Sequence, residues 1–191
     1  VEIILEVLEG LGACHAQKLI HRDLTPDNIY ITTGGAVKIL DFGSARVTQE
    51  GGDNEFTQIL KKSYAPIEQF QQGSSQGPWT DIYSVGATLY RLITGQPPAL
   101  NSVDRLLNDT LLKPSEIKKF SGWNDALEES LMKALSVRPE NRYQEIDSFK
   151  VDLLNARLTS GAKVAKISSP APSSLKPTSP KQTASKSINK T

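Results

Sequence analysis

Apolar residues recur every three or four positions in several stretches of the chain, which is the spacing of an amphipathic helix. In residues 2–18, charged residues separate Ile4, Leu5, Leu8 and Leu11. The same spacing predicts three further helices. The first contains Ile82, Val85, Leu89, Leu92 and Ile93, and we expect Thr80 to cap it and Gly95 and Pro97 to mark its end. The second contains Trp123, Ala126, Leu127, Leu131 and Leu135, and the third contains Ile146, Phe149, Leu153 and Leu154.

Two short segments follow the pattern of strands. Residues 29–33 and 36–40 are rich in β-branched and apolar residues, and they flank Gly34-Gly35, which indicates a hairpin with a two-residue turn. Residues 44–79 are rich in glycine and turn-forming residues and are predicted to form loops. Two strands among many helices predict an α+β, mainly helical fold and exclude a Rossmann sheet.

Composition divides the chain near residue 158. Residues 159–191 contain eight Ser, four Thr, four Pro and six Lys but no Asp or Glu. Such a segment buries too little apolar surface to offset its ordering entropy, so we expect a folded domain over 1–158 and a disordered linker or tail over 159–191.

Charge and special residues exclude several classes of protein. The net charge of +1 gives no field that would favour nucleic acid or a membrane surface. The single cysteine, Cys14, excludes an internal disulfide framework, and two histidines disfavour a His-rich metal site. No signal peptide or apolar run of membrane-spanning length is present, so we expect a cytoplasmic chain, with membrane association only through segments beyond the tail.

The predicted hairpin allows a calculation about chemistry. With a two-residue turn, Thr33 faces Ala36, and Asn28 then lies opposite Asp41 with β-carbons about 5 Å apart. An amide oxygen and a carboxylate at that separation suit Mg²⁺, which fills its remaining coordination sites with phosphate oxygens and water. Asp23 lies five residues before Asn28 and adds a free carboxylate, a combination that fits phosphoryl transfer.

The same residues carry a family resemblance. His21-Arg22-Asp23-Leu24 followed by Asn28 resembles the catalytic loop of protein kinases, and Asp41-Phe42-Gly43 resembles their magnesium-binding motif. Further matches in the same order extend the resemblance from residue 1 to about 156: Tyr64 to Gln69 (end of the activation segment), Pro78 to Gly86 (central helix), and Arg138 to Tyr143. The chain is most similar to the large, C-terminal lobe of a bacterial Ser/Thr protein kinase.

The resemblance implies catalytic and ligand-binding roles. Asp23 would accept or orient the proton of the substrate hydroxyl. Asn28 and Asp41 would hold Mg²⁺ against the phosphates of ATP. Tyr30 would lie under the adenine, and Arg22 would pair with a phosphate on the activation segment. The implied partners are ATP and a protein substrate with a Ser or Thr hydroxyl.

Structural and regulatory roles follow from the same resemblance. Glu68 would pair with Arg142, and Asp81 would anchor the backbone of the catalytic loop. The ring of His21 would stack with Phe42, next to Gly43. Thr57 is a candidate phosphorylation site, equally well explained as an ordinary loop hydroxyl. His15 is expected to cap or pack a helix end, Cys14 to fill the core, and Trp79 and Trp123 to pack.

Two departures from the family pattern affect these expectations. Only 20 residues precede His21 in the sequence, and they form one predicted helix without a Gly-rich loop or a strand lysine. We therefore expect these 191 residues alone to bind ATP poorly and to transfer phosphate at a negligible rate. Thr25 stands where the family usually has lysine, and Lys61 stands where it usually has threonine, which suggests a reciprocal exchange; Lys62 is a less favoured donor, and Lys61 as a solvated loop charge is the alternative.

Two alternatives come from other functional classes. The chain could be a non-catalytic remnant that binds partners through its helical surface. It could also resemble kinases of small-molecule hydroxyls, such as aminoglycoside or choline kinases, which share the core motifs. Those enzymes should lack the Tyr64–Gln69 motif and its Arg142 partner, both of which this chain contains.

Overall fold

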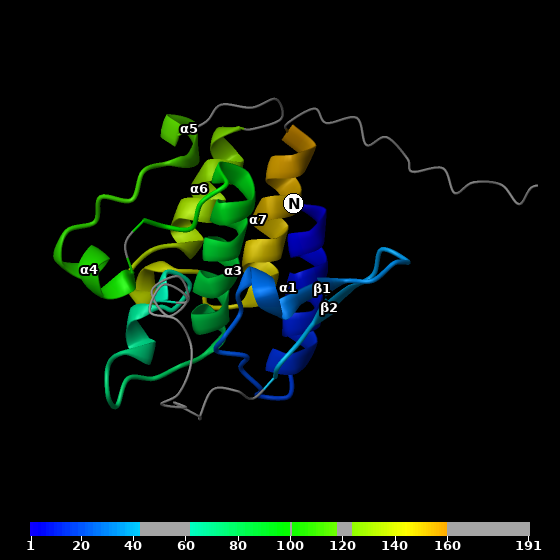
Figure 1. The fold of residues 1–191 in the computed structure, drawn as a ribbon, viewed down its shortest axis with the longest axis horizontal. Helices are drawn as coiled ribbons and strands as arrows, with labels where there is room; N and C mark the ends of the chain where they lie inside the picture. The colour runs from blue at the N-terminus through cyan, green and yellow to red at the C-terminus, as the bar shows by residue number, and fades with distance from the viewer. Residues whose placement is uncertain (43–61, 100, 118–123, 160–191) are drawn as a thin grey trace, which may run out of the picture.

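The computed structural model describes residues 1–42, 62–99, 101–117 and 124–159. Four helices form its body: α1 (Glu2–His15), α3 (Pro78–Thr94), α6 (Asp125–Ala134) and α7 (Ile146–Thr159). Figure 1 shows them side by side, with α3 packed against α1, α6 and α7. Shorter helices complete the described part, namely α4 (Ser102–Leu107), α5 (Pro114–Ile117) and the 3₁₀ turns η1 (Pro26–Asn28), η2 (Ile67–Gln69) and η3 (Pro139–Asn141).

Helix α3 is the centre of the core. All of its residues from Thr80 to Tyr90 are buried, including polar ones, because neighbouring elements cover every side of the helix. The helix ends at Gly95, whose φ of +83° is the left-handed conformation that glycine adopts without strain. This end matches the prediction from sequence.

The cap predicted for α3 at Thr80 is wrong, whereas Pro78, with which the motif Pro78 to Gly86 begins, is the first residue of the helix. The helix begins at Pro78, two residues before Thr80, because proline at the first helical position needs no hydrogen-bond partner for its nitrogen. Thr80 is the third helical residue, and its hydroxyl accepts a hydrogen bond from the Gly77 backbone N–H at 3.2 Å. Thr80 therefore still satisfies the helix terminus, but from inside the helix.

The apolar spacing identified the other long helices, with differences at their ends and faces. Helix α1 ends at His15, and the chain then turns through Lys18 with φ +60°, so the predicted helix is three residues too long. Leu92 and Leu154 are 56% and 36% exposed, so they lie outside the buried faces to which the pattern assigned them. Ala126 is also exposed, and Trp123 lies outside the described residues.

The hairpin is present, but its register differs from the prediction. Strand β1 (Ile29–Ile31) pairs antiparallel with β2 (Val37–Ile39), with Ile29 opposite Ile39 and Ile31 opposite Val37. The turn contains three residues, Thr33 to Gly35, and Gly35 has φ +85°. A type I turn followed by a left-handed glycine explains the extra residue.

The change of register affects the predicted pair of Mg²⁺ ligands, Asn28 and Asp41. Asn28 now faces Leu40, whose N–H donates to the Asn28 carbonyl at 2.9 Å, so the predicted position of Asn28 directly opposite Asp41 is wrong. Asp41 follows one residue later, with φ +59°. The hairpin itself lies against α1 (Figure 1).

Helix α7 extends to Thr159, next to the domain boundary predicted at residue 158. Within the described ranges, no helix combines the length and apolar character needed to cross a bilayer. The segment 160–191, to which the tail prediction applies, lies outside the described residues.

Candidate active site

The loop that joins α1 to the hairpin is anchored by one buried carboxylate. Asp81, on the first turn of α3, is fully buried and accepts hydrogen bonds from the backbone N–H groups of His21 (2.9 Å) and Arg22 (2.8 Å). The Nε2 atom of His15 lies 2.7 Å from the same carboxylate. A buried carboxylate requires such partners, so α3 fixes the loop at these two peptide groups.

His21 connects this loop to the end of strand β2. Its ring is fully buried, and Nε2 lies 2.8 Å from the Leu40 carbonyl, which can only accept. Nε2 therefore carries the proton, and Nδ1 accepts from the Asp23 N–H at 3.3 Å. The ring also meets Phe42 edge-on, with centroids 4.6 Å apart. The two rings are thus in contact, as the resemblance implied, but edge to face and not stacked.

Asp23 and Asn28 are held together at the start of the hairpin. The Asn28 side-chain nitrogen donates to the Asp23 backbone carbonyl at 2.6 Å and lies 3.4 Å from the Asp23 carboxylate. This use of the nitrogen leaves the Asn28 amide oxygen as the atom that could bind a cation. The preceding residue, Arg22, has φ +70°, a conformation that residues other than glycine seldom adopt and that the surrounding contacts must maintain.

The donor set fits Mg²⁺. Asn28 offers an amide oxygen, and Asp41, an exposed residue, offers a carboxylate. Mg²⁺ typically takes a small number of oxygen ligands from a protein. Among the described residues no group of three or more His, Cys, Asp or Glu could form a larger metal centre. A site for a phosphate-bound Mg²⁺ is therefore chemically reasonable here, whereas an all-protein metal cage is not indicated in this part of the chain.

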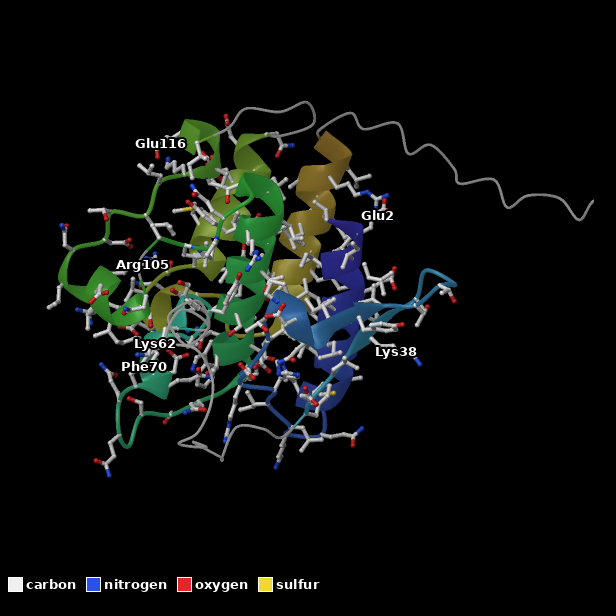
Figure 2. The ribbon with its side chains drawn as sticks, in the orientation of Figure 1. Glu2, Lys38, Lys62, Phe70, Arg105 and Glu116 are labelled. Atoms are coloured by element: carbon white, nitrogen blue, oxygen red, sulfur yellow. The ribbon has the colours of Figure 1, made fainter. Side chains whose placement is uncertain are left out.

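The segment around Tyr64 lies beside Asp23 and Thr25. Asp23, Thr25, Tyr64 and Ala65 line the same narrow cavity, together with Ser84, whose hydroxyl donates to the Tyr64 carbonyl at 2.9 Å. Thr25 is 4% exposed. Figure 2 labels Lys62 and Phe70, which bracket this segment, to the left of α3 in this view.

Glu68 and Arg142 form the predicted ion pair. It is bidentate, with distances of 2.7 and 3.0 Å, and both side chains are buried. Thr80 donates its hydroxyl proton to the same carboxylate at 3.0 Å, and Arg142 also donates to the carbonyls of Ser136 and Val137, both at 2.7 Å. The end of the Tyr64–Gln69 segment is therefore fixed to α3 and to the loop before α7.

The remaining predicted residues are placed as follows. Tyr30 is 53% exposed on β1, opposite Lys38. Burial raises the pKa of the Cys14 thiol, which disfavours the reactive thiolate. Cys14 is only partly buried and is not part of the core, so the expectation that it fills the core is wrong. Gly43, Thr57 and Lys61 lie outside the described residues.

Two residues near the site were missed by the sequence analysis. His15 was expected only to cap or pack a helix end, but it contacts Asp81. Gln69 donates from its side-chain nitrogen to the Arg22 carbonyl. Neither contact has a signal in local sequence, since each joins residues at least 47 positions apart.

Comparison with known proteins identifies the class of protein to which the chain belongs. The family described as protein kinase domain matches residues 1–156, and the chain belongs to the protein kinase family. The serine/threonine-protein kinase PknB of Mycobacterium tuberculosis (strain ATCC 25177 / H37Ra) is 34% identical over 163 residues, which cover 81% of this chain and 25% of that protein. The probable serine/threonine-protein kinase PknB of Lactococcus lactis subsp. lactis (strain IL1403) is 29% identical over 158 residues, 80% of this chain and 25% of that protein.

A solved structure shares the fold. The structure titled "PpkA-294 apo form" aligns with a TM-score of 0.62 and 34% identity over 78% of this chain and 51% of that one. The protein-kinase-like, mainly helical fold, with one two-stranded sheet among the described residues, is thus as predicted. The chain spans about a quarter of the length of the curated relatives that it matches.

Proposed function

We propose that this chain contributes the catalytic loop and magnesium-binding residues of a protein kinase that transfers phosphate from ATP to serine or threonine. The observation that carries the proposal is the catalytic loop itself. Asp81 and His21 fix its backbone, and a hydrogen bond joins Asp23 to Asn28. Phe42, which follows strand β2, contacts the ring of His21, which precedes strand β1.

In the proposed reaction, the substrate hydroxyl oxygen forms a bond to the γ-phosphorus of ATP, the bond to the bridging oxygen breaks, and ADP leaves. The Asp23 carboxylate orients the hydroxyl and takes its proton. Asn28 and Asp41 would hold Mg²⁺, which when bound neutralises charge on the phosphates. Arg22 Nε is buried without a hydrogen-bond partner among the described residues, which supports pairing of Arg22 with a phosphate on the activation segment.

A protein substrate is favoured over a small molecule. The Tyr64–Gln69 segment lies beside Asp23, and the buried pair between Glu68 and Arg142 fixes its end. These features place an ordered peptide segment next to the proposed base, where a substrate chain could be aligned. The small-molecule kinases considered above are expected to lack both features.

The first experiment compares the full-length gene product with the 191-residue chain in a phosphotransfer assay with ATP, Mg²⁺ and a Ser/Thr peptide mixture. We expect turnover by the full-length gene product and negligible turnover by the 191 residues, in which no Gly-rich loop or strand lysine precedes the catalytic loop to clamp the phosphates.

The Asp23→Asn variant of the full-length product should lose about 100-fold or more of its kcat, because the amide cannot accept the proton. Asp125→Asn, the same exchange at an exposed position on α6, is the control and should keep its activity. Equal activity of Asp23→Asn and the control would refute the proposed role of Asp23. Phosphotransfer by the 191-residue chain that depends on Asp23 would refute its expected inactivity.

A further inference from the structure

We propose that Gln69 is a positioning residue that fixes the peptide group between Arg22 and Asp23, a role that rests on the proposed function of Asp23. The Gln69 side-chain nitrogen lies 2.5 Å from the Arg22 carbonyl oxygen. Because a carbonyl only accepts, the amide nitrogen must face it, so chemistry fixes the orientation of the glutamine. The contact joins the end of the Tyr64–Gln69 segment directly to the residue before the proposed base.

Gln69 binds the carbonyl of Arg22, which takes part in none of the contacts through which Asp81, His21 and Asn28 hold the loop. Asp81 accepts from the N–H groups of His21 and Arg22, and Asn28 donates to the carbonyl of Asp23. The peptide between Arg22 and Asp23 is held at its N–H by the His21 ring and at its carbonyl by Gln69. Release of the carbonyl would allow this peptide to rotate and would change the direction of the Asp23 side chain.

The conformation of Arg22 makes this contact more important. Its φ of +70° is sparsely populated for a residue with a side chain, so it persists only where the surroundings determine it. Gln69 is itself well placed to do so, since Glu68, its neighbour, is fixed by Arg142 and Thr80. A continuous set of contacts thus runs from Arg142 through Glu68 and Gln69 to the backbone at Asp23.

The test uses residue-resolved amide hydrogen exchange on the full 191-residue chain. Gln69→Met keeps the length of the side chain and removes the donor. We expect the Asp23 amide to exchange about tenfold faster or more in Gln69→Met, with the exchange of α3 and the unfolding temperature unchanged. Gln72→Met, the same substitution at an exposed neighbour, should exchange like the unsubstituted chain.

A second variant tests the hydrogen bond itself. Gln69→Glu should behave like Gln69→Met at pH 7, because a carboxylate cannot donate. Its Asp23 amide should return toward the exchange rate of the unsubstituted chain as the pH falls through about 4.3, the ordinary glutamate pKa, since the protonated acid donates again. A role in packing alone would produce no such recovery.

The outcomes separate the two proposals, because exchange requires no turnover. Unchanged Asp23 exchange in Gln69→Met, or equal acceleration throughout the chain, overturns the positioning role. Faster exchange at Asp23 supports the contact even if the full-length gene product shows no phosphotransfer, a result that would refute the proposed function instead. Where turnover is measured, Gln69→Met should lower kcat about tenfold and leave the KM for ATP unchanged, and an effect on KM alone would contradict positioning.

Discussion

Asp81 is the residue on which the position of the catalytic loop depends most directly. A carboxylate without any solvent exposure is unfavourable unless hydrogen-bond donors surround it, and His15, His21 and Arg22 provide those donors. The loop in turn needs hydrogen-bond acceptors for its own N–H groups, and the Asp81 carboxylate is the acceptor for two of them. Burial of one side chain on α3 therefore determines where the backbone leading to Asp23 lies.

Thr25 stands beside Asp23 at the position where the protein kinase family usually has a lysine, and therefore a positive charge. A threonine at 4% exposure in the cavity next to Asp23 provides no cation for the transferred phosphate. We propose that Lys61, which lies outside the described residues, supplies that cation. Tyr64 and Ala65 line the cavity at Asp23, which supports the proposal because the chain reaches the catalytic loop only three residues after Lys61.

The proposed reciprocal exchange of lysine and threonine between positions 25 and 61 predicts different effects for two adjacent lysines. In the full-length gene product, Lys61→Ala should lower kcat by about 100-fold or more, the scale of removing one group that stabilises charge in the transition state. Lys62→Ala should have little effect, since Lys62 is exposed and is the less favoured donor. Steady-state phosphotransfer kinetics measure kcat for both variants, and equal, mild losses of kcat would contradict the proposed role of Lys61.

At the residue scale, motif spacing located the residues that carry a recognisable pattern. Asp81 and the pair of Glu68 and Arg142 lie where the resemblance implied, and the structure shows their contacts. His15 and Gln69 could not be found this way. Each makes its contact through the three-dimensional arrangement of α1, α3 and η2, and a histidine or glutamine has no distinctive sequence context for it.

At the scale of elements, the hairpin turn determines which residues face each other. A two-residue turn and a three-residue turn have nearly the same sequence signal when two glycines are adjacent. They differ in backbone conformation: the two-residue turn of type I′ requires positive φ at both glycines, whereas here only Gly35 has it. That difference shifted Asn28 from Asp41 to Leu40.

The turn makes a prediction about alanine substitution. Gly35→Ala should lower the free energy of unfolding by about 1 kcal/mol, because alanine is strained at φ +85° although no atom lies within 4 Å of its β-carbon. Gly34→Ala should change it by less than about 0.5 kcal/mol. Urea unfolding of the 191-residue chain compares the two variants, and equal losses would favour the two-residue turn.

Helix prediction succeeded where burial is periodic and failed where it is not. Ile4, Leu8 and Leu11 are fully buried along one side of α1, as their spacing indicates. Helix α3 is covered on all sides only from Thr80 to Tyr90, so the periodicity contains little information about where its burial stops, and Leu92, predicted on the buried face, lies exposed beyond that part. Helix starts depend on local capping contacts: the N-cap of α3 is Gly77, three residues before the predicted Thr80, and the apolar spacing alone contains no information about this difference.

At the scale of the whole molecule, the buried pair between Glu68 and Arg142 joins segments 74 positions apart. Arg142 also stacks over the ring of Tyr83 at 4.8 Å, and burial raises the pKa of the Tyr83 hydroxyl, which keeps it neutral beside the ion pair. The catalytic loop, the segment before α3 and the loop before α7 therefore share one set of polar contacts around α3. Both the free energy of unfolding and the geometry at Asp23 should therefore depend on this set of polar contacts.

Glu68→Gln tests this dependence. The substitution leaves the Arg142 charge buried without its carboxylate, which typically costs about 3–5 kcal/mol, so urea unfolding of the 191-residue chain should show a loss of about 3 kcal/mol or more. The matched control is Glu140→Gln, which removes an exposed pair with Arg138 at 4.0 Å and should cost less than about 1 kcal/mol. Replacing both partners, as Glu68→Leu with Arg142→Met, should recover only part of the loss, because the Ser136 and Val137 carbonyls would lose their donors. If Glu68→Gln were no more destabilising than the control, the buried pair could not be what holds these three segments together.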